Sequence, residues 1–251
     1  MSKIADKVDV QKLKAKIGMK LAEKGMSGRT AQVVFSIDIS GSMDGLYRNE
    51  TVQRVVERAM ALSLNMDDDG NLPAFMFGIK AHAPVVATAT NIDGFVKDQL
   101  LRQISGRLEG GTNYAPVLEL VARHHFEAAF QQKKKGLFGG GGGVEVVKIP
   151  AVKDPVFNIF VTDGANGDPA DAERIIREIS KLPMFTQFVG IGRERKDFLE
   201  KLDDLSGRFV DNAGFCELGD ISQMDDDDFV GALLNEYPEW CTKAQGLGLI
   251  L

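Results

Sequence analysis

The amino-acid sequence predicts an α/β fold, in which helices flank a doubly wound, mostly parallel central sheet with an antiparallel edge strand. Short apolar runs such as AQVVFSI (residues 31–37) and PVFNIFV (155–161) alternate with longer segments of helical pattern. This alternation is typical of parallel sheets, because parallel strands need crossover connections that usually contain a helix. Both runs are apolar almost throughout, which predicts central strands covered on both faces.

An N-terminal amphipathic helix is expected before the sheet begins. Apolar residues recur at roughly helical spacing over residues 3–24, and the helix is predicted to end near Gly25. The chain of 251 residues is long enough for one large domain, so we divide it into an N-terminal extension (1–28) and a main domain (29–251). We expect the helix to pack against that domain; docking onto a partner is the alternative.

The remaining elements follow from the same patterns. Strands are expected at residues 31–37, 74–79, 85–89, 156–161, 185–191 and 208–210. Helices are expected at residues 50–64, 92–101, 116–130, 169–181, 195–202 and 228–237. The run VVATAT (85–90) follows AFMFGI (74–79) closely, which predicts a hairpin and therefore the antiparallel edge strand.

A glycine-rich insertion is predicted at residues 131–152. It begins QQKKKGLFGGGGGV, with three lysines and then five consecutive glycines. Ordering a glycine run loses much backbone entropy, so we expect a flexible surface excursion. A phosphate-binding loop is not expected, because Val-Glu-Val-Val-Lys follows the glycines in place of Gly-Lys-Ser/Thr.

Charge and cysteine content exclude several classes of protein. The formal net charge of −6 gives no electrostatic reason to expect binding to nucleic acid or to an anionic membrane. Cys216 and Cys241 are far apart in the sequence, which predicts neither a disulfide framework nor a zinc site. No signal peptide or membrane span is evident. We therefore expect a cytoplasmic protein.

Polar residues in an unusual spacing follow the first predicted sheet strand. In FSIDISGSM (35–43), Asp38, Ser40 and Ser42 occupy alternate positions, with a glycine between the serines. In a parallel sheet, ligands collect at the carboxyl ends of the strands, where these residues lie. Carboxylate and hydroxyl oxygens suit a hard cation such as Mg²⁺, Mn²⁺ or Ca²⁺. The alternative is that Asp38 or Ser40 only caps the next helix.

Two further loops carry the same chemistry. Thr112 lies in GGTNY (110–114), before a predicted helix, and Asp163 lies in FVTDG (160–164), after an apolar strand. Each loop alone is ordinary turn chemistry. All three loops are expected at the same edge of the sheet, so together they predict a cation site made by Asp38, Ser40, Ser42, Thr112 and Asp163.

These residues resemble the metal-ion-dependent adhesion site (MIDAS) of von Willebrand factor A (vWA) domains. The similarity lies in DISGSM (38–43), Gly111-Thr112 and Thr162-Asp163-Gly164, and the order of elements fits over about residues 29–240. The resemblance implies a Rossmann-like vWA fold in which the serines and Thr112 supply hydroxyls and both aspartates bind the metal, directly or through water. The lysine-rich N-terminal helix and YPEWC (237–241) more narrowly resemble the vWA domains of bacterial tellurite-resistance and stress-response proteins.

The expected function is cation-dependent binding of a protein partner that supplies an Asp or Glu to the metal, most readily Mg²⁺. One alternative is a metal-dependent hydrolase or phosphatase with Asp38 as nucleophile, but Ser40 stands where a second acid is wanted, so we do not expect an enzyme. Another is a scaffold that binds through its N-terminal helix without metal. His124 and His125 are expected at the surface.

Overall fold

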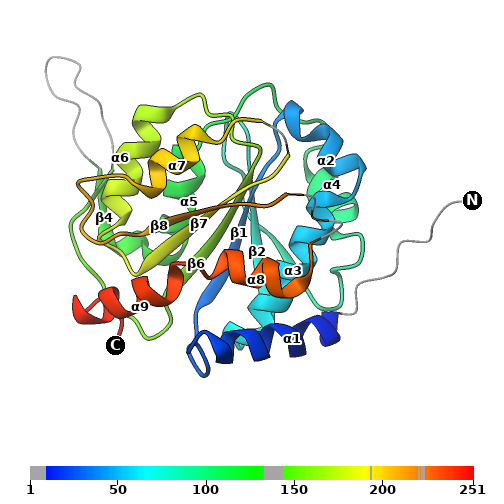
Figure 1. Cartoon of the computed structure of the whole chain (residues 1–251). Coiled ribbons are helices and arrows are strands. Elements are labelled where there is room, and N and C mark those ends of the chain that lie inside the picture. The colour runs from blue at the N-terminus through cyan, green and yellow to red at the C-terminus, as the bar shows by residue number, and fades with distance from the viewer. Residues whose placement is uncertain (1–9, 133–143, 193, 220, 222–223) are drawn as a thin grey trace, which may run out of the picture.

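The computed structural model describes residues 10–132, 144–192, 194–219, 221 and 224–251. A six-stranded sheet runs through the centre, with helices on both faces (Figure 1). Its strands are β1 (Gln32–Asp38), β2 (Asn71–Phe77), β3 (Val85–Thr88), β6 (Val156–Thr162), β7 (Met184–Gly190) and β8 (Ala213–Glu217). Their order in the sheet is β3-β2-β1-β6-β7-β8, which confirms the predicted α/β class.

The strand directions also agree with the prediction. β1 pairs in parallel with β2 and with β6, and β7 is parallel to both β6 and β8. β3 is antiparallel to β2, with Leu72 opposite Ala87, so VVATAT forms the antiparallel edge. From β1 the chain first extends the sheet to one side and later to the other, so the order reverses between β1 and β6.

The last sheet strand lies at residues 213–217, and the prediction of a strand at 208–210 is wrong. Side chains hold the predicted segment in a loop: Arg208 donates to the Asp203 carbonyl (2.6 Å) and pairs with Asp211 (2.7 Å). The true strand, AGFCE, was missed because it has a glycine at its second position and lacks a continuous apolar run.

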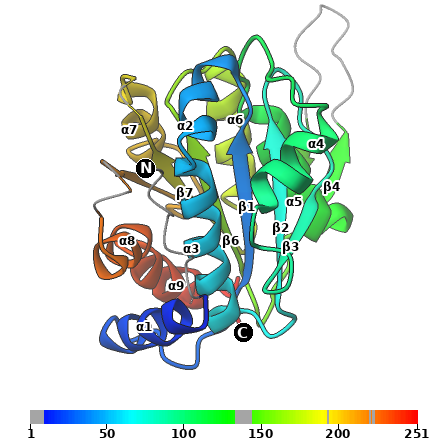
Figure 2. The same ribbon diagram turned by 90° about the vertical axis from the view of Figure 1, so that its right-hand side faces the viewer.

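Helices cover the two faces of the sheet in separate groups (Figure 2). One core cluster contains residues of α1 (Val10–Glu23), α3 (Thr51–Met66), α8 (Asp226–Leu233) and α9 (Tyr237–Gly246). The other contains residues of α5 (Ala115–Phe126), α6 (Pro169–Ile179) and α7 (Asp197–Asp203). Consecutive β1 residues alternate between the clusters: Phe35 joins the first and Val34 the second. The central strands are therefore buried on both sides.

Several expected helices have different bounds. The helix expected at 228–237 is α8, which ends at Leu233, and a further helix that was not predicted, α9, begins at Tyr237. Pro238 lies in the first turn of α9, where its missing N–H is tolerated. The helix expected at 116–130 ends at Phe126, followed by a 3₁₀ turn (η3, Glu127–Ala129). The helix expected at 92–101 is a π-helical turn (η2, Val96–Leu100) and a short α4 (Leu101–Gln103). A short η1 (Gly41–Met43) and α2 (Asp44–Arg48) precede α3.

The ends of the glycine-rich insertion pair with each other. β4 (Phe130–Gln132) and β5 (Val144–Val146) form a two-stranded antiparallel sheet with Phe130 opposite Val146. The insertion's five glycines lie outside the described residues, as do residues 1–9 of the predicted N-terminal helix.

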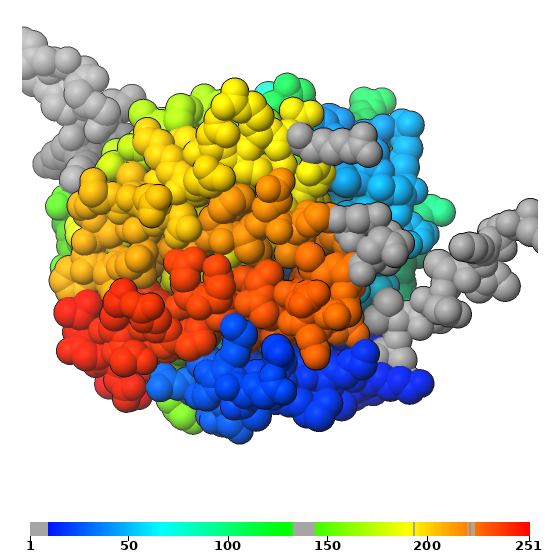
Figure 3. Space-filling model, viewed as in Figure 1, coloured from blue at the N-terminus to red at the C-terminus, as the bar shows by residue number. Residues whose placement is uncertain are grey.

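The described part of the N-terminal helix, α1, lies against the domain. Leu13, Ile17 and Leu21 are buried in the same core cluster as α3 and α8. The Asn65 amide of α3 also donates to the Lys14 carbonyl (2.9 Å). Figure 3 shows α1 beside α8 on the molecular surface. Within the described residues, no helix combines the length and apolar character needed to cross a membrane.

Candidate metal centre

The first loop of the candidate site begins where β1 ends. Asp38 is the last residue of β1 and is fully buried, and Ser40 is 3% exposed. The Ser40 amide donates to Asp38 Oδ1 (2.7 Å), and the Ser40 and Ser42 hydroxyls lie 3.0 Å apart. Ser40 precedes η1 but its side chain makes no capping bond, so the helix-cap alternative does not explain its position. The loop brings one carboxylate and two hydroxyls together.

The Asp38 carboxylate is buried at the point where the order of strands reverses. β1 ends there beside β6, and the Thr162 hydroxyl of β6 donates to Asp38 Oδ2 (2.7 Å). Burial raises the pKa of Asp38 to about 6, while the bonds from Thr162 and Ser40 lower it and the nearby Asp163 raises it. Such a reversal is where open α/β sheets bind their ligands.

The third loop places Asp163 beside Asp38. Asp163 directly follows β6 and is 2% exposed. Its Oδ1 accepts from the Ala165 amide (3.3 Å), whereas Oδ2 has no hydrogen-bond partner among the described residues. Gly164 has φ +104°, and a side chain there would place Cβ 2.5 Å from the Arg195 carbonyl oxygen. The loop therefore requires glycine directly after Asp163.

The second loop, with Thr112, is bonded to its neighbours through the backbone. The Gly167 amide donates to the Thr112 carbonyl (2.7 Å), and the Asn113 amide donates to the Gly78 carbonyl (2.8 Å). Asp168 accepts from the amides of Tyr114 and Ala115, at 2.8 and 3.0 Å. Thr112 is 5% exposed, and its hydroxyl has no partner among the described residues.

Glu109 connects the first and second loops, a role that was not predicted from the sequence. Its amide donates to the Ile39 carbonyl (2.8 Å), and its carbonyl accepts from the Gly41 amide (2.9 Å). Its carboxylate accepts from the Ile79 amide (2.7 Å) and lies 2.6 Å from His82 Nε2. Glu109 thus fixes the approach to Thr112. These bonds join segments far apart in the chain, which no local pattern reveals.

The donor set fits a hard divalent cation. It consists of two carboxylates and three hydroxyls, from Asp38, Asp163, Ser40, Ser42 and Thr112. A buried polar atom without a partner is costly, yet neither Thr112 Oγ1 nor Asp163 Oδ2 has a partner among the residues that the structure describes. No group of three or more His, Cys, Asp or Glu residues suited to a metal occurs in the described part of the chain. The site therefore relies on hydroxyl oxygens, which suit Mg²⁺, Mn²⁺ or Ca²⁺ in preference to softer metals.

Comparison with known sequences gives matches over most of the chain. A sequence model of the vWA-TerF-like family, described as the vWA found in the TerF C terminus, matches residues 30–149 and 144–250. The uncharacterized protein YcbR of Bacillus subtilis (strain 168) is 33% identical over 243 residues, covering 97% of this chain and 90% of YcbR.

Solved structures share the fold. Proximal thread matrix protein 1 (PTMP1) from the mussel byssus has a TM-score of 0.56 and 15% identity, over 84% of this chain and 48% of that chain. Another PTMP1 structure, described as having a zinc-occupied MIDAS motif, has a TM-score of 0.53 and 17% identity, over 85% and 48%. A mutant PilB minor pilin from Streptococcus sanguinis has a TM-score of 0.50 and 10% identity, over 86% and 64%. The chain spans about half the length of the mussel chains.

Proposed function

The chain belongs to the vWA-TerF-like family of von Willebrand factor A domains, and from this membership we propose that it is a non-enzymatic module that binds a partner protein through a divalent cation. The residues that would hold the cation are Asp38, Ser40, Ser42, Thr112 and Asp163. A partner Asp or Glu would complete the coordination.

The observation that carries this proposal is the pair of unsatisfied oxygens at the edge of the sheet. Thr112 Oγ1 and Asp163 Oδ2, on two different loops, are buried and have no hydrogen-bond partner in the described part of the chain. The first loop contributes Asp38, whose carboxylate is already oriented by Thr162. Leaving two such atoms unpaired destabilises the fold, and a cation held between the loops would satisfy both.

The chemistry of the donor set indicates what the module binds. The two carboxylates would formally balance the two charges of a divalent cation, so an outside carboxylate would be bound through a coordination position left open by these side chains. Mg²⁺ prefers six oxygen ligands in an octahedron, one more than the five side chains offer. The carboxylates of Asp38 and Asp163 would hold the ion, and the three hydroxyls would add oxygens without adding charge. We propose Mg²⁺ as the bound cation. The zinc in the MIDAS motif of mussel PTMP1 supports a divalent cation in general.

We place the module in a cytoplasmic, bacterial stress-response system of the tellurite-resistance kind. The TerF-like family description and the resemblance of the N-terminal helix and residues 237–241 support this proposal. The partner is a protein.

Metal titration tests the proposal directly. Isothermal titration of wild-type protein should show one Mg²⁺ or Mn²⁺ site, and Asp163→Ala should weaken the affinity at least about tenfold, because it removes a charged ligand. Asp171→Ala is the matched control, since Asp171 is also an acid after β6 but is exposed and paired with Arg174 (3.0 Å). Equal affinities in all three proteins would contradict the proposed site.

Partner capture tests the bridging role. Wild-type protein should retain a host protein in Mg²⁺ and release it in EDTA, and Asp163→Ala should not retain it. A partner that Asp163→Ala still retains, or that EDTA does not release, would argue for the scaffold alternative.

A further inference from the structure

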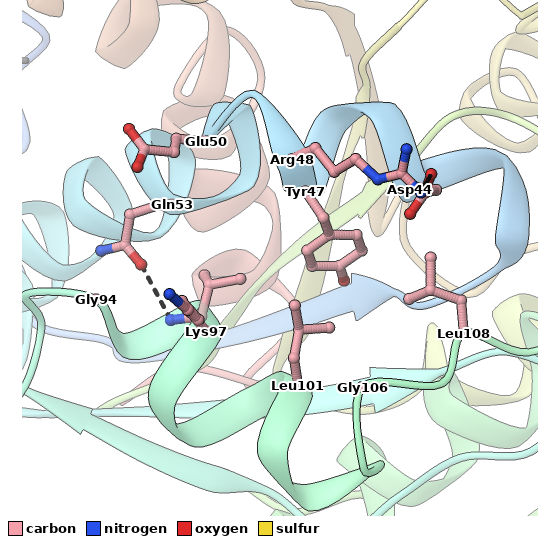
Figure 4. Close-up of a pocket in the computed structure, with 11 residues that line it drawn as sticks. Asp44, Tyr47, Arg48, Glu50, Gln53, Gly94, Lys97, Leu101, Gly106 and Leu108 are labelled. Atoms are coloured by element: carbon pink, nitrogen blue, oxygen red, sulfur yellow. Dashed lines mark hydrogen bonds and ion pairs between the residues drawn. The ribbon is translucent and has the colours of Figure 1, made fainter. Parts of the chain in front are cut away.

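A cavity of about 400 Å³ lies beside the first metal-site loop. One wall is formed by α2 and the start of α3, and the other by η2, α4 and the segment that follows (Figure 4). In Figure 4 the ring of Tyr47 extends from α2 toward Leu101 of α4, with Leu108 alongside. The cavity therefore lies between two segments that each lead into or out of the candidate metal centre.

Both walls are connected to residues of that centre. The Tyr47 hydroxyl donates to the main-chain carbonyl of Asp38 (2.7 Å), so one side chain lines the cavity and bonds to the first loop. Leu108 directly precedes Glu109, whose backbone pairs with Ile39 and Gly41. The cavity and the cation site thus share their supporting structure.

The lining indicates what kind of group the cavity accepts. Tyr47, Leu101 and Leu108 present apolar surface. Four charged side chains also line it, two acidic and two basic, and two of them, Asp44 and Arg48, pair with each other (2.7 Å). The charges therefore sum to zero, so the lining favours neither an anion nor a cation.

The side chain of Gln53, a polar residue of the lining, already makes hydrogen bonds within the protein. The Gln53 amide donates to the Ile92 carbonyl (2.7 Å), and its oxygen accepts from the Val96 amide (3.0 Å). Glu50, between α2 and α3, has φ +63°, a conformation that non-glycine residues adopt at some cost and that concentrates at ligand sites. An uncharged, bulky side chain fits this lining better than a polar one.

We propose that the cavity receives an aromatic side chain from the same partner segment whose carboxylate binds the metal. The inference rests on the proposed function. An aromatic ring buries a large apolar area and loses little conformational entropy, which explains its frequency at centres of interfaces. The partner motif is then one acidic and one aromatic residue a few positions apart. The acid would bind the cation, and the ring would fill the cavity lined by Tyr47, Leu101 and Leu108, called here the Tyr47–Leu108 cavity. Two weak contacts on one short segment reinforce each other.

A displayed library of random peptides, each with one fixed Glu, tests this motif. Peptides that bind wild-type protein in Mg²⁺ and elute in EDTA should be enriched in Phe, Tyr or Trp at a constant distance from the Glu. Leu101→Glu places a charge in the cavity, away from the metal loops, and should weaken the selected peptides at least about tenfold. Its Mg²⁺ affinity should equal that of wild type, which also shows that the variant is folded.

The matched control is Leu120→Glu. Leu120 is also partly buried, and it lines a different pocket together with Ile79 and Asn113 near the second loop. This variant should bind the selected peptides like wild type. Mg²⁺-dependent peptides without aromatic enrichment, or equal losses in the two variants, would overturn the cavity inference and leave the proposed function standing. Absence of any Mg²⁺-dependent acidic peptide would overturn both.

Discussion

Thr162 is a small residue on which the geometry of the candidate centre depends. Its fully buried hydroxyl donates to Asp38 Oδ2 (2.7 Å) and lies 3.2 Å from the Tyr114 hydroxyl. The Gly164 amide also donates to it (3.2 Å). One hydroxyl thereby joins the end of β1, the start of α5 and the loop after β6.

Replacing Thr162 by valine should destabilise the protein, because the buried Asp38 carboxylate loses a donor while the shape of the side chain is kept. We expect the free energy of unfolding to fall by about 1–3 kcal/mol at neutral pH. Urea denaturation without added metal measures this change.

Thr186→Val is the matched control for Thr162→Val. Thr186 lies on the neighbouring strand β7 and is equally buried, but its hydroxyl has no hydrogen-bond partner among the described residues. The control should be neutral or slightly stabilising, since removing an unpaired buried hydroxyl relieves a penalty. Equal losses in both variants would mean that the bond to Asp38 contributes nothing specific.

At the level of elements, α5 carries two adjacent histidines that were expected at the surface: His124 is exposed, whereas His125 is partly buried. His125 Nδ1 lies 2.8 Å from Gln32 Oε1 of β1, and its buried Nε2 has no partner among the described residues. A protonated ring would place an N–H there without an acceptor. Burial, with a smaller contribution from His124, lowers the pKa of His125 from 6.5 to about 4.

Acid should therefore weaken the fold through His125. Between pH 6.5 and 4, His125 is protonated in the unfolded chain but neutral in the folded protein. Its contribution to the free energy of unfolding is therefore fully present above pH 6.5 and is lost as the pH falls. We expect a loss of about 2 kcal/mol between pH 7 and 5 from this residue. Urea denaturation of wild type and His125→Gln at both pH values measures it, and the variant should show a smaller loss.

The exposed neighbour His124 provides the control for this pH dependence. His124→Gln removes an adjacent imidazole from the same helix and leaves the partly buried His125 in place. It should keep most of the wild-type dependence. If both variants lose as much stability as wild type between pH 7 and 5, the His125 ring is not the cause of the pH dependence.

The elements best predicted from sequence were those whose environment is uniform. β1 and β6 are covered on both faces, so each is a continuous apolar run. β8 is the edge strand opposite β3, and its residues 215–217 are partly or fully exposed, so it left no such run. The helix expected at 228–237 extends past the end of α8 at Leu233 because apolar residues continue to Tyr237, and α9 itself was missed, although Pro238 marks its start.

For the molecule as a whole, the candidate site could be located from sequence because the topology of the sheet brings its residues to one edge. Parallel strands end at one edge, so polar residues after two apolar runs, with a third loop before a helix, point to one place. Glu109 and the Tyr47–Leu108 cavity could not be found in this way. Their roles depend on backbone pairing between residues 39–41 and 109 and on packing between α2 and α4, which are properties of the folded chain.

Because the cation would join three loops, its removal should lower the free energy of unfolding of the whole domain. Saturating Mg²⁺, at about 100 times its dissociation constant, should stabilise wild type by about 2.7 kcal/mol. Thr112→Val should lose much of this gain while remaining at least as stable as wild type in EDTA, because the Thr112 hydroxyl is buried and no described residue bonds to it. Urea denaturation of both proteins in Mg²⁺ and in EDTA measures these opposite effects. An unchanged Mg²⁺ gain in Thr112→Val would remove Thr112 from the site, and a loss of stability in EDTA would show that its hydroxyl already has a structural role.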